Sequence, residues 1–358
     1  VRIIMKKTIA VLFGGQSSEH EVSCVSAITI ASCINTEEYN VVLIGITKEG
    51  QWLIYDGPVE HIKTGEWEKY GTPAIISPDA TQKSIFKIIG DKIKKIPVDV
   101  IFPVLHGKWG EDGTIQGLFE MAQIPYVGDN VLASCISMDK VFTKMVAKAA
   151  HIEQANYLWF YTYELEHCEN ILNQIEKELQ YPCFIKPANT GSSVGITKAH
   201  DREELKKALY YAAKFDTKVI AEEFIDGREI ECSVLGNENP VASGVGEIFS
   251  ASEFYDYDAK YNNAESKTVV PAKLEKEITD NIREIAIKIF KAVEGTGLAR
   301  VDFLIQKNTN RIIFNELNTM PGFTSISMYP MLWEAEGKSK ELLIDELIAL
   351  AFSKQQCK

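Results

Sequence analysis

The sequence predicts an α/β fold that is divided into two or three domains. Its 358 residues exceed what one simple hydrophobic core organises. In the first third of the chain, apolar segments alternate with helical patterns, which is typical of a sheet joined by crossover helices. A smaller mixed unit and a strand-rich unit follow, so we expect an α+β arrangement in the remainder.

The first unit, residues 5–135, opens with an apolar strand at 7–13 and continues with a helix at 22–33. Further strands are expected at 41–47 and 98–103, and the alternation predicts a parallel sheet. Gly14-Gly15 and Leu105-His106-Gly107 each follow one of these strands. Ligands collect at the carboxyl ends of parallel strands, so this unit is expected to form one wall of a site.

The second unit, residues 136–226, begins with a helix at 141–150. Strands are expected at 182–186 and 195–198, on either side of a glycine- and serine-rich turn at 189–195. A helix at 202–214, with Asp201 as its N-cap, precedes a strand at 219–224.

The third unit, residues 227–358, contains a helix at 275–293, strands at 299–306 and 311–315, and a closing helix near 340–352. Residues 249–267 lack a clear apolar period. Long loops of this kind are often functional lids, so we expect one here.

Composition excludes several classes of protein. The formal net charge is −12, whereas a general nucleic-acid or anionic-membrane binder needs a broad basic face. No apolar run approaches the ~20 residues that span a bilayer. The seven cysteines form no C-x-x-C pair, which favours reduced thiols in the cytoplasm. Met5 is the expected natural start.

Two neighbouring strands near the C-terminus carry an arginine and three oxygen ligands. Arg300 and Asp302 lie on the first strand, and Glu316 and Asn318 follow on the second. Carboxylate and amide oxygens suit Mg2+, which shares its other positions with substrate phosphates. The alternative is a pair of strands with solvated charges on one face.

Two segments of the second unit are typical of nucleotide contacts. Lys186 precedes a small-residue loop whose backbone N–H groups can approach phosphates, although a flexible hairpin turn is the alternative. The loop lacks the P-loop order, and 337–339 only resembles the end of one. Residues 221–229 can pair with an adenine edge, with Glu229 on the ribose; an ordinary interdomain linker is the alternative.

Four further residues have both a structural and a functional interpretation. Glu19 near a helix N-terminus is either a capping charge or the partner of a substrate ammonium. His106 among glycines is either structural or close to a ligand. Lys260 and Tyr261 in the expected lid either pack the loop or contact phosphate and the reacting groups.

The motifs GGQSSEHEVS, HGKWGEDGT, MDK, KPANTGSSVG, FYDYDAKY, ARVDF and FNELNTMPGFTSIS occur in this order. Together they resemble the D-alanine–D-alanine ligases of the ATP-grasp superfamily over nearly the whole chain. The resemblance implies three domains, with ATP held between the sheets of the second and third. It also implies a homodimer formed through the first domain.

The resemblance assigns roles to individual residues. ATP would be bound by Lys140, Lys186, Ser193 and Lys260 at the phosphates, the backbone of Glu222, Phe224 and Ile225 at adenine, and Glu229 at the ribose. Asp302, Glu316 and Asn318 would bind two Mg2+, with Mn2+ as a substitute and activation by a monovalent cation left open. Glu19 would hold the first D-alanine and join Ser192 and Tyr261 in a hydrogen-bonded trio. Arg300 and the Gly322 backbone would stabilise the oxyanion, and His106, Ser327 and Met328 would line the second subsite.

Two alternatives stay open. D-Ala–D-Ser and D-Ala–D-Lac ligases of the vancomycin-resistance type share these motifs, but Tyr261 and the apolar Met328 favour D-alanine. A nucleotide-binding protein without catalysis would lack ligands that are present here. Residues 150–155 depart from the family's Gly-Ile-x-x-Pro pattern, which bears on packing more than on activity.

Overall fold

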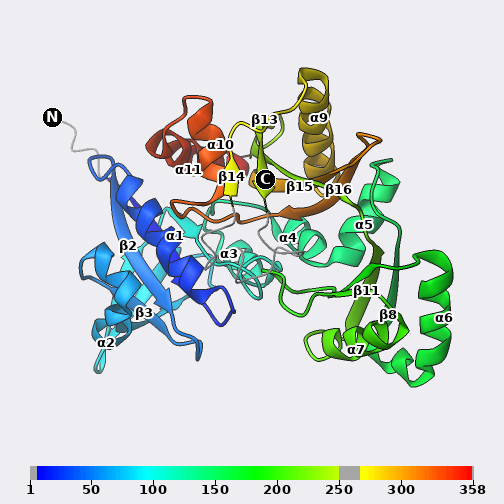
Figure 1. Ribbon diagram of the computed structural model, residues 1–358. Helices are drawn as coiled ribbons and strands as arrows, with labels where there is room; N and C mark the ends of the chain where they lie inside the picture. Colours follow the sequence, from blue (N-terminus) through cyan, green and yellow to red (C-terminus); the bar gives the residue numbers. More distant parts are fainter. Residues whose placement is uncertain (1–5, 250–266, 357–358) are drawn as a thin grey trace.

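The computed structural model describes residues 6–249 and 267–356, and it contains three sheets (Figure 1). The expected lid residues Lys260 and Tyr261 therefore lie outside the described residues. The sheets occupy successive parts of the chain, within residues 7–103, 157–223 and 227–318. No helix in the described ranges is both long and apolar enough to cross a membrane.

The N-terminal sheet has seven strands in the order β6-β5-β4-β3-β2-β1-β7. Their bounds are β1 Lys7–Gly14, β2 Tyr39–Ile46, β3 Trp52–Tyr55, β4 Thr72–Ile76, β5 Ser84–Ile89, β6 Lys92–Pro97 and β7 Val100–Pro103. Only β2, β1 and β7 are parallel, so the expectation of a parallel sheet is wrong for the other four strands. The two-residue link between β5 and β6 is far too short for a crossover helix, so those strands pair antiparallel.

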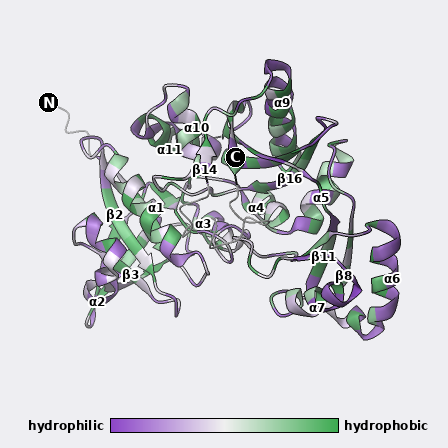
Figure 2. Cartoon of the chain, in the orientation of Figure 1, coloured by the Kyte–Doolittle hydropathy of each residue, from purple (hydrophilic) through white to green (hydrophobic). Residues whose placement is uncertain are grey.

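Alternating residues of β1 face two different cores. Ile9, Val11 and Phe13 pack with α1 His20–Cys33, whereas Ala10 and Leu12 pack with α3 Thr114–Ala122. This is the period of two expected of a strand buried on both faces. In Figure 2, β2 and much of α1 are coloured as hydrophobic. The short helices η1 Val59–Thr64 and α2 Glu66–Tyr70 complete this domain.

The central sheet is antiparallel, in the order β10-β9-β11-β8. It comprises β8 Tyr157–Tyr161, β9 Cys183–Pro187, β10 Thr197–Ala199 and β11 Lys218–Glu223. One face is covered by α6 Cys168–Glu178 and α7 Arg202–Ala212, following η2 Thr162–His167. As predicted, Asp201 caps α7 by accepting from the Glu204 N–H. The other face packs against Val141 of α5 Lys140–Ala149.

The C-terminal sheet has the order β14-β13-β12-β15-β16. Its strands are β12 Gly227–Gly236, β13 Val241–Phe249, β14 Lys267–Val269, β15 Gly297–Gln306 and β16 Ile312–Asn318. Helix α9 Lys276–Ala292 covers one face, beside α4 Val131–Met138. Helices α10 Met328–Ala335 and α11 Lys340–Gln356 pack between this sheet and the N-terminal domain.

One apolar core joins the N-terminal domain to the C-terminal part of the chain. Phe102 of β7 lies in the same cluster as Phe323, Tyr329 and Leu347. The central sheet has a core of its own that is confined to residues 160–221. The N-terminal and C-terminal walls of any site between them are therefore fixed to each other by shared packing.

Candidate active site

Strand register places the predicted arginine and oxygen ligands on one face of the C-terminal sheet. Arg300 is paired with Asn318, and Asp302 is paired with Glu316, across β15 and β16. Directly paired residues share a face, and so do residues two apart along one strand. Glu231 of β12 is paired with Asp302 and joins the same face.

Arg300 is held by two carboxylates. Its Nε and Nη2 each donate to Asp302 at 2.8 Å, and Nε lies 3.0 Å from Oε2 of Glu231. Burial alone would lower the pKa of Arg300, but these carboxylates raise that pKa well above its ordinary value. The guanidinium is therefore a permanent, oriented positive charge at the edge of the cleft.

The donor set around Asp302 fits a hard divalent cation. Asn318 donates its Nδ2 to Asp302 at 3.0 Å, so the two predicted ligands are adjacent. In the described ranges no group of three or more His, Cys, Asp or Glu is arranged to hold a metal. Two carboxylates and one amide match the partial shell that Mg2+ completes with phosphate oxygens and water.

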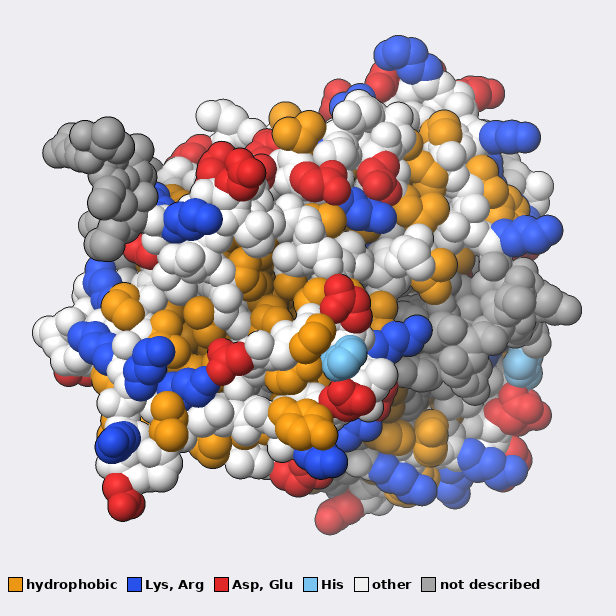
Figure 3. Space-filling view, turned by 90° about the vertical axis from the view of Figure 1, so that its left-hand side faces the viewer, with side chains coloured by type: hydrophobic (Ala, Val, Ile, Leu, Met, Phe, Trp, Pro, Cys, Tyr) orange, Lys and Arg blue, Asp and Glu red, His pale blue; other side chains and the backbone are white. Residues whose placement is uncertain are grey.

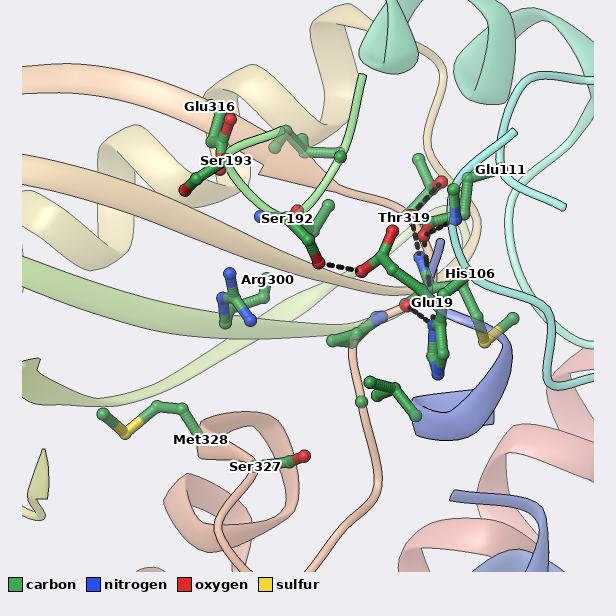
Figure 4. Close-up of a pocket in the computed structure, with 18 of the residues that line it drawn as sticks. Glu19, His106, Glu111, Ser192, Ser193, Arg300, Glu316, Thr319, Ser327 and Met328 are labelled. Carbon is green, nitrogen blue, oxygen red and sulfur yellow. Dashed lines mark hydrogen bonds and ion pairs between the residues drawn. The ribbon is translucent and has the colours of Figure 1, made fainter. Parts of the chain in front are cut away.

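Glu19 lies between two glycine-containing loops at the centre of the cleft (Figure 4). Ser192 donates a hydrogen bond to its carboxylate. A Cβ added at Gly191 would lie 2.6 Å from Oε2 of Glu19, and one added at Gly107 would lie 2.8 Å away. Glycine at both positions lets the loops approach this carboxylate.

The loop at 189–195 is anchored at its base and has an unusual conformation at its tip. Lys140 donates to the Thr190 carbonyl at 2.6 Å, and the Asn189 N–H donates to Asp216 at 2.8 Å. Ser192 and Ser193 have φ of 48° and 59°, a conformation that side-chain-bearing residues rarely adopt. Such strain often marks functional loops.

A second cleft lies between the central and C-terminal sheets. Glu222 at its base receives a hydrogen bond from Lys186 at 2.7 Å, and Lys144 approaches the other carboxylate oxygen at 3.3 Å. Burial would raise the pKa of Glu222, but the two lysines lower it to about 2. The apolar side chains that line it come from both sheets and from the link between them, and include Phe184, Phe224, Ile225, Leu304 and Ile313.

Three side chains of the N-terminal domain hold the loop that follows β16. His106 Nδ1 donates to the Met320 carbonyl at 2.9 Å, and Glu111 accepts from the Met320 N–H at 3.2 Å. Ser26 Oγ accepts from the Phe323 N–H at 3.1 Å and lies 3.3 Å from His106 Nε2. Both ring nitrogens of His106 are therefore engaged by the protein.

Burial shifts both titratable members of this cluster. Burial lowers the pKa of His106, which favours the neutral imidazole that these contacts require. Burial and the nearby Glu19 raise the pKa of Glu111 to about 8, against the opposing effect of its backbone donors. Figure 4 shows these residues on one side of the cleft, with Arg300 across from them.

The predicted second subsite is formed by residues that come directly after the loop that follows β16. Ser327 Oγ accepts from the Thr324 N–H at 3.0 Å, and a Cβ at Gly322 would lie 2.7 Å from it. Met328 is buried with Ile248 and Leu332. The side chain at 328 thus presents an apolar surface to the cleft.

Together the two adjoining clefts are lined by every predicted site residue that the structure describes. Six of these residues line the second cleft only: Lys186, Glu222, Phe224, Ile225, Glu229 and Asp302. Lys260 and Tyr261 lie outside the described residues. The sequence analysis missed Ser26, Glu111, Lys144 and Glu231. Lys144 had a readable signal, since it lies one helical turn after Lys140, and Glu111 falls within the glycine loop that contains His106.

Comparison with known proteins gives matches along almost the full length. Residues 8–129 match the family model described as D-ala D-ala ligase N-terminus, and residues 146–349 match the model described as D-ala D-ala ligase C-terminus. The D-alanine–D-alanine ligase of Acetivibrio thermocellus is 54% identical, over 97% of this chain and 96% of that protein. That of Clostridium acetobutylicum is 51% identical, over 98% and 99%.

Two solved structures are similar to this chain in fold and in sequence. The VanG D-Ala:D-Ser ligase from Enterococcus faecalis has a TM-score of 0.88 and 41% identity, covering 97% of this chain and 100% of that chain. The D-alanine-D-alanine ligase from Coxiella burnetii has a TM-score of 0.84 and 34% identity, covering 98% and 96%.

Proposed function

The chain belongs to the D-alanine–D-alanine ligase family, and we propose on that premise that it joins two D-alanines into D-alanyl-D-alanine for peptidoglycan precursors, with ATP as the energy source. The observation that carries this function is the 54% identity over 97% of the chain. The fold is accordingly the ATP-grasp fold, and the three sheets support a division into domains at 5–135, 136–226 and 227–358.

In the first step, the carboxylate of the first D-alanine attacks the γ-phosphorus of ATP. An acyl phosphate forms, the bond to the β-phosphate oxygen breaks, and ADP leaves. Glu19 holds the ammonium of this D-alanine as a carboxylate partner. Lys140 and Lys186, with Ser193 and Lys260, neutralise the phosphates.

ATP is proposed to lie between the central and C-terminal sheets. The apolar lining from both sheets accommodates adenine, against the backbone of Glu222, Phe224 and Ile225. Glu229 lines the same cleft and is proposed to accept from the ribose hydroxyls.

Asp302, Glu316 and Asn318 are proposed to hold two Mg2+, for which Mn2+ can substitute. Bound there, the metal supplies charge neutralisation for the transferring phosphoryl group. The support is the shared face of β15 and β16 and the oxygen-rich donor set.

In the second step, the amine of the second D-alanine attacks the acyl-phosphate carbonyl. Arg300 and the Gly322 N–H stabilise the tetrahedral oxyanion, and one well-placed donor of this kind contributes about 3 kcal/mol. The carbon–oxygen bond to phosphate then breaks and inorganic phosphate leaves. The amine proton is proposed to pass to the Ser192 hydroxyl as that hydroxyl gives its own proton to the Glu19 carboxylate, its hydrogen-bond partner. Tyr261 is the expected third member of this trio, and Ser327 is proposed to line the subsite of the second substrate.

D-Alanine is proposed as the second substrate because Met328 lies among apolar side chains, which suit a methyl group. Hydrophobic pockets reject an added hydroxyl only modestly, and the VanG likeness makes D-serine the competing substrate. The test measures phosphate release from Mg-ATP with D-alanine alone, with added D-serine and with added D-lactate, and identifies products by mass. D-Alanyl-D-alanine that persists against both competitors supports the proposal, and a dominant mixed product contradicts it.

We further propose a homodimer formed through the N-terminal domain. Ile75 of β4 and Ile93 of the edge strand β6 are 53% and 68% exposed. Figure 3 faces the side of the molecule on which the N-terminal domain lies, and it shows hydrophobic side chains among charges of both signs. Sedimentation velocity tests the dimer.

Activation by a monovalent cation is tested by measuring the reaction rate at increasing potassium concentration. The need for ATP supports a cytoplasmic location.

A further inference from the structure

Lys144 is a buried lysine for which the proposed reaction has no direct use. It lies on α5 one turn after Lys140, and its side chain is only 2% exposed. Its Nζ lies 3.3 Å from Oε1 of Glu222 and 5.5 Å from the centre of the Tyr157 ring. A lysine enclosed in this way cannot reach a nucleotide itself.

Glu222 connects Lys144 to the cleft. Lys186 of β9 is paired with Ile220 of β11, and Glu222 lies two residues further along β11. The side chains of Lys186 and Glu222 therefore share one face of the central sheet. Lys186 donates to Oε2 of Glu222, and Lys144 faces Oε1. The carboxylate thus lies between two amines.

Lys186 is more exposed than Lys144, and only Lys186 faces the cleft. The side chain of Lys186 is 12% exposed and lines the second cleft, whereas Lys144 is behind the carboxylate. The two lysines lower the pKa of Glu222, so its carboxylate is negatively charged between them. Because Lys144 shares this carboxylate, the negative charge of Glu222 does not by itself neutralise Lys186, and the group of three keeps a net positive charge.

We propose that Lys144 is a positioning residue of the nucleotide site: through Glu222 it fixes the Lys186 ammonium and keeps that ammonium available for the ATP phosphates. This inference rests on the proposed contact between Lys186 and ATP. A lysine that served only to fill space in the core would affect folding but not ATP in particular.

The test is steady-state kinetics of the full-length Lys144→Met variant, in which a side chain of similar length loses its charge. The KM for ATP is expected to rise about tenfold, as for the loss of one charge-assisted contact. The KM for D-alanine is expected to stay within twofold. Lys148→Met on the exposed side of the same helix is the matched control and is expected to leave both values unchanged.

A double-mutant cycle with Glu222→Gln separates positioning from general damage. If Lys144 acts through Glu222, Lys144→Met changes the KM for ATP by less than twofold in the Glu222→Gln background. An equal tenfold rise in both backgrounds, or a parallel rise in the KM for D-alanine, overturns the inference. Should Lys144→Met fail to fold, Lys144→Gln keeps a donor without the charge and is held to the same criteria.

Two further measurements keep this inference distinct from the function on which it rests. If Lys186→Met leaves the KM for ATP unchanged, the proposed phosphate contact is wrong whatever Lys144 does. If the unmodified protein forms no D-alanyl-D-alanine, the proposed function itself fails. A clear effect of Lys186→Met with none of Lys144→Met overturns only the positioning role.

Discussion

Glu111→Gln is expected to change how stability depends on pH. Glu111 is buried, and burial together with the nearby Glu19 raises its pKa to about 8 from the ordinary 4.5. The folded protein therefore retains a proton that the unfolded chain releases above pH 4.5. This contribution to stability is complete below pH 4.5, is lost as the pH rises to about 8, and is constant above that.

The expected magnitude follows from that interval. Each pH unit between the two pKa values costs about 1.4 kcal/mol of unfolding free energy, so the whole interval corresponds to a few kcal/mol. Glutamine does not titrate, and this contribution is absent in the variant. Glutamine also has one acceptor oxygen, whereas Glu111 accepts from both the Gly107 and the Met320 N–H. The unmet donor adds a pH-independent loss of about 1–3 kcal/mol.

The assay is urea unfolding of both proteins from pH 5 to pH 8.5 at constant ionic strength, with the exposed Glu178→Gln as control. The unfolding free energy of the unmodified protein should fall towards that of Glu111→Gln as the pH rises. Asp129, whose pKa burial also raises to about 8, retains its own contribution in both proteins. Parallel curves for the unmodified protein and Glu111→Gln would refute the argument that Glu111 is held protonated.

Further predictions concern the cleft and one helix end. Arg300→Met should lower kcat at least 100-fold and destabilise the protein by about 3 kcal/mol, because two buried carboxylates lose their cation; rapid-quench kinetics and urea unfolding measure these effects. Gly191→Ala should raise the KM for D-alanine because the added Cβ displaces Glu19, and an unchanged KM would contradict the assigned role of that carboxylate. Glu316→Gln should raise the Mg2+ concentration that gives half-maximal rate, which a metal titration at fixed ATP detects. His151→Gly should stabilise the fold by about 1 kcal/mol in thermal unfolding, because His151, directly after the C-cap of α5, has φ of 53°, a conformation that favours glycine.

The sequence was sufficient for the elements with strong local patterns. The parallel strands β1, β2 and β7 and the helices α1, α7, α9 and α11 all lie within a few residues of their predicted bounds, and the predicted N-cap of α7 is present. The hairpin strands β3 to β6 were missed because they are short, because β4 and β6 are partly exposed, and because β6 is rich in lysine. Their pairing depends on neighbours that local patterns do not reveal.

The same limit applies to the site. Residues that would touch substrate lie in glycine-rich or acidic motifs, where chemistry restricts the residue type, and these could be read directly. Ser26 and Lys144 act on other protein groups from the middle of helices. A serine or lysine there has no distinguishing local pattern, so only the packing of α1 and α5 brings them to the site.

The division of the cores has a consequence for how the two reaction steps respond to mutation. Glu19, Arg300 and the loop at 319–323 are carried by elements that pack into or beside the core shared by the N-terminal and C-terminal parts. Lys186 and the loop at 189–195 belong to the central sheet, whose core is separate. Helix α5 lies between the central and C-terminal sheets, since Val141 packs on the other face of the central sheet and Ala147 lies in the core that contains α9 and β15. Cavity-forming substitutions in the central core should therefore weaken ATP binding first, whereas those around Phe323 should disturb the oxyanion donors and the second subsite.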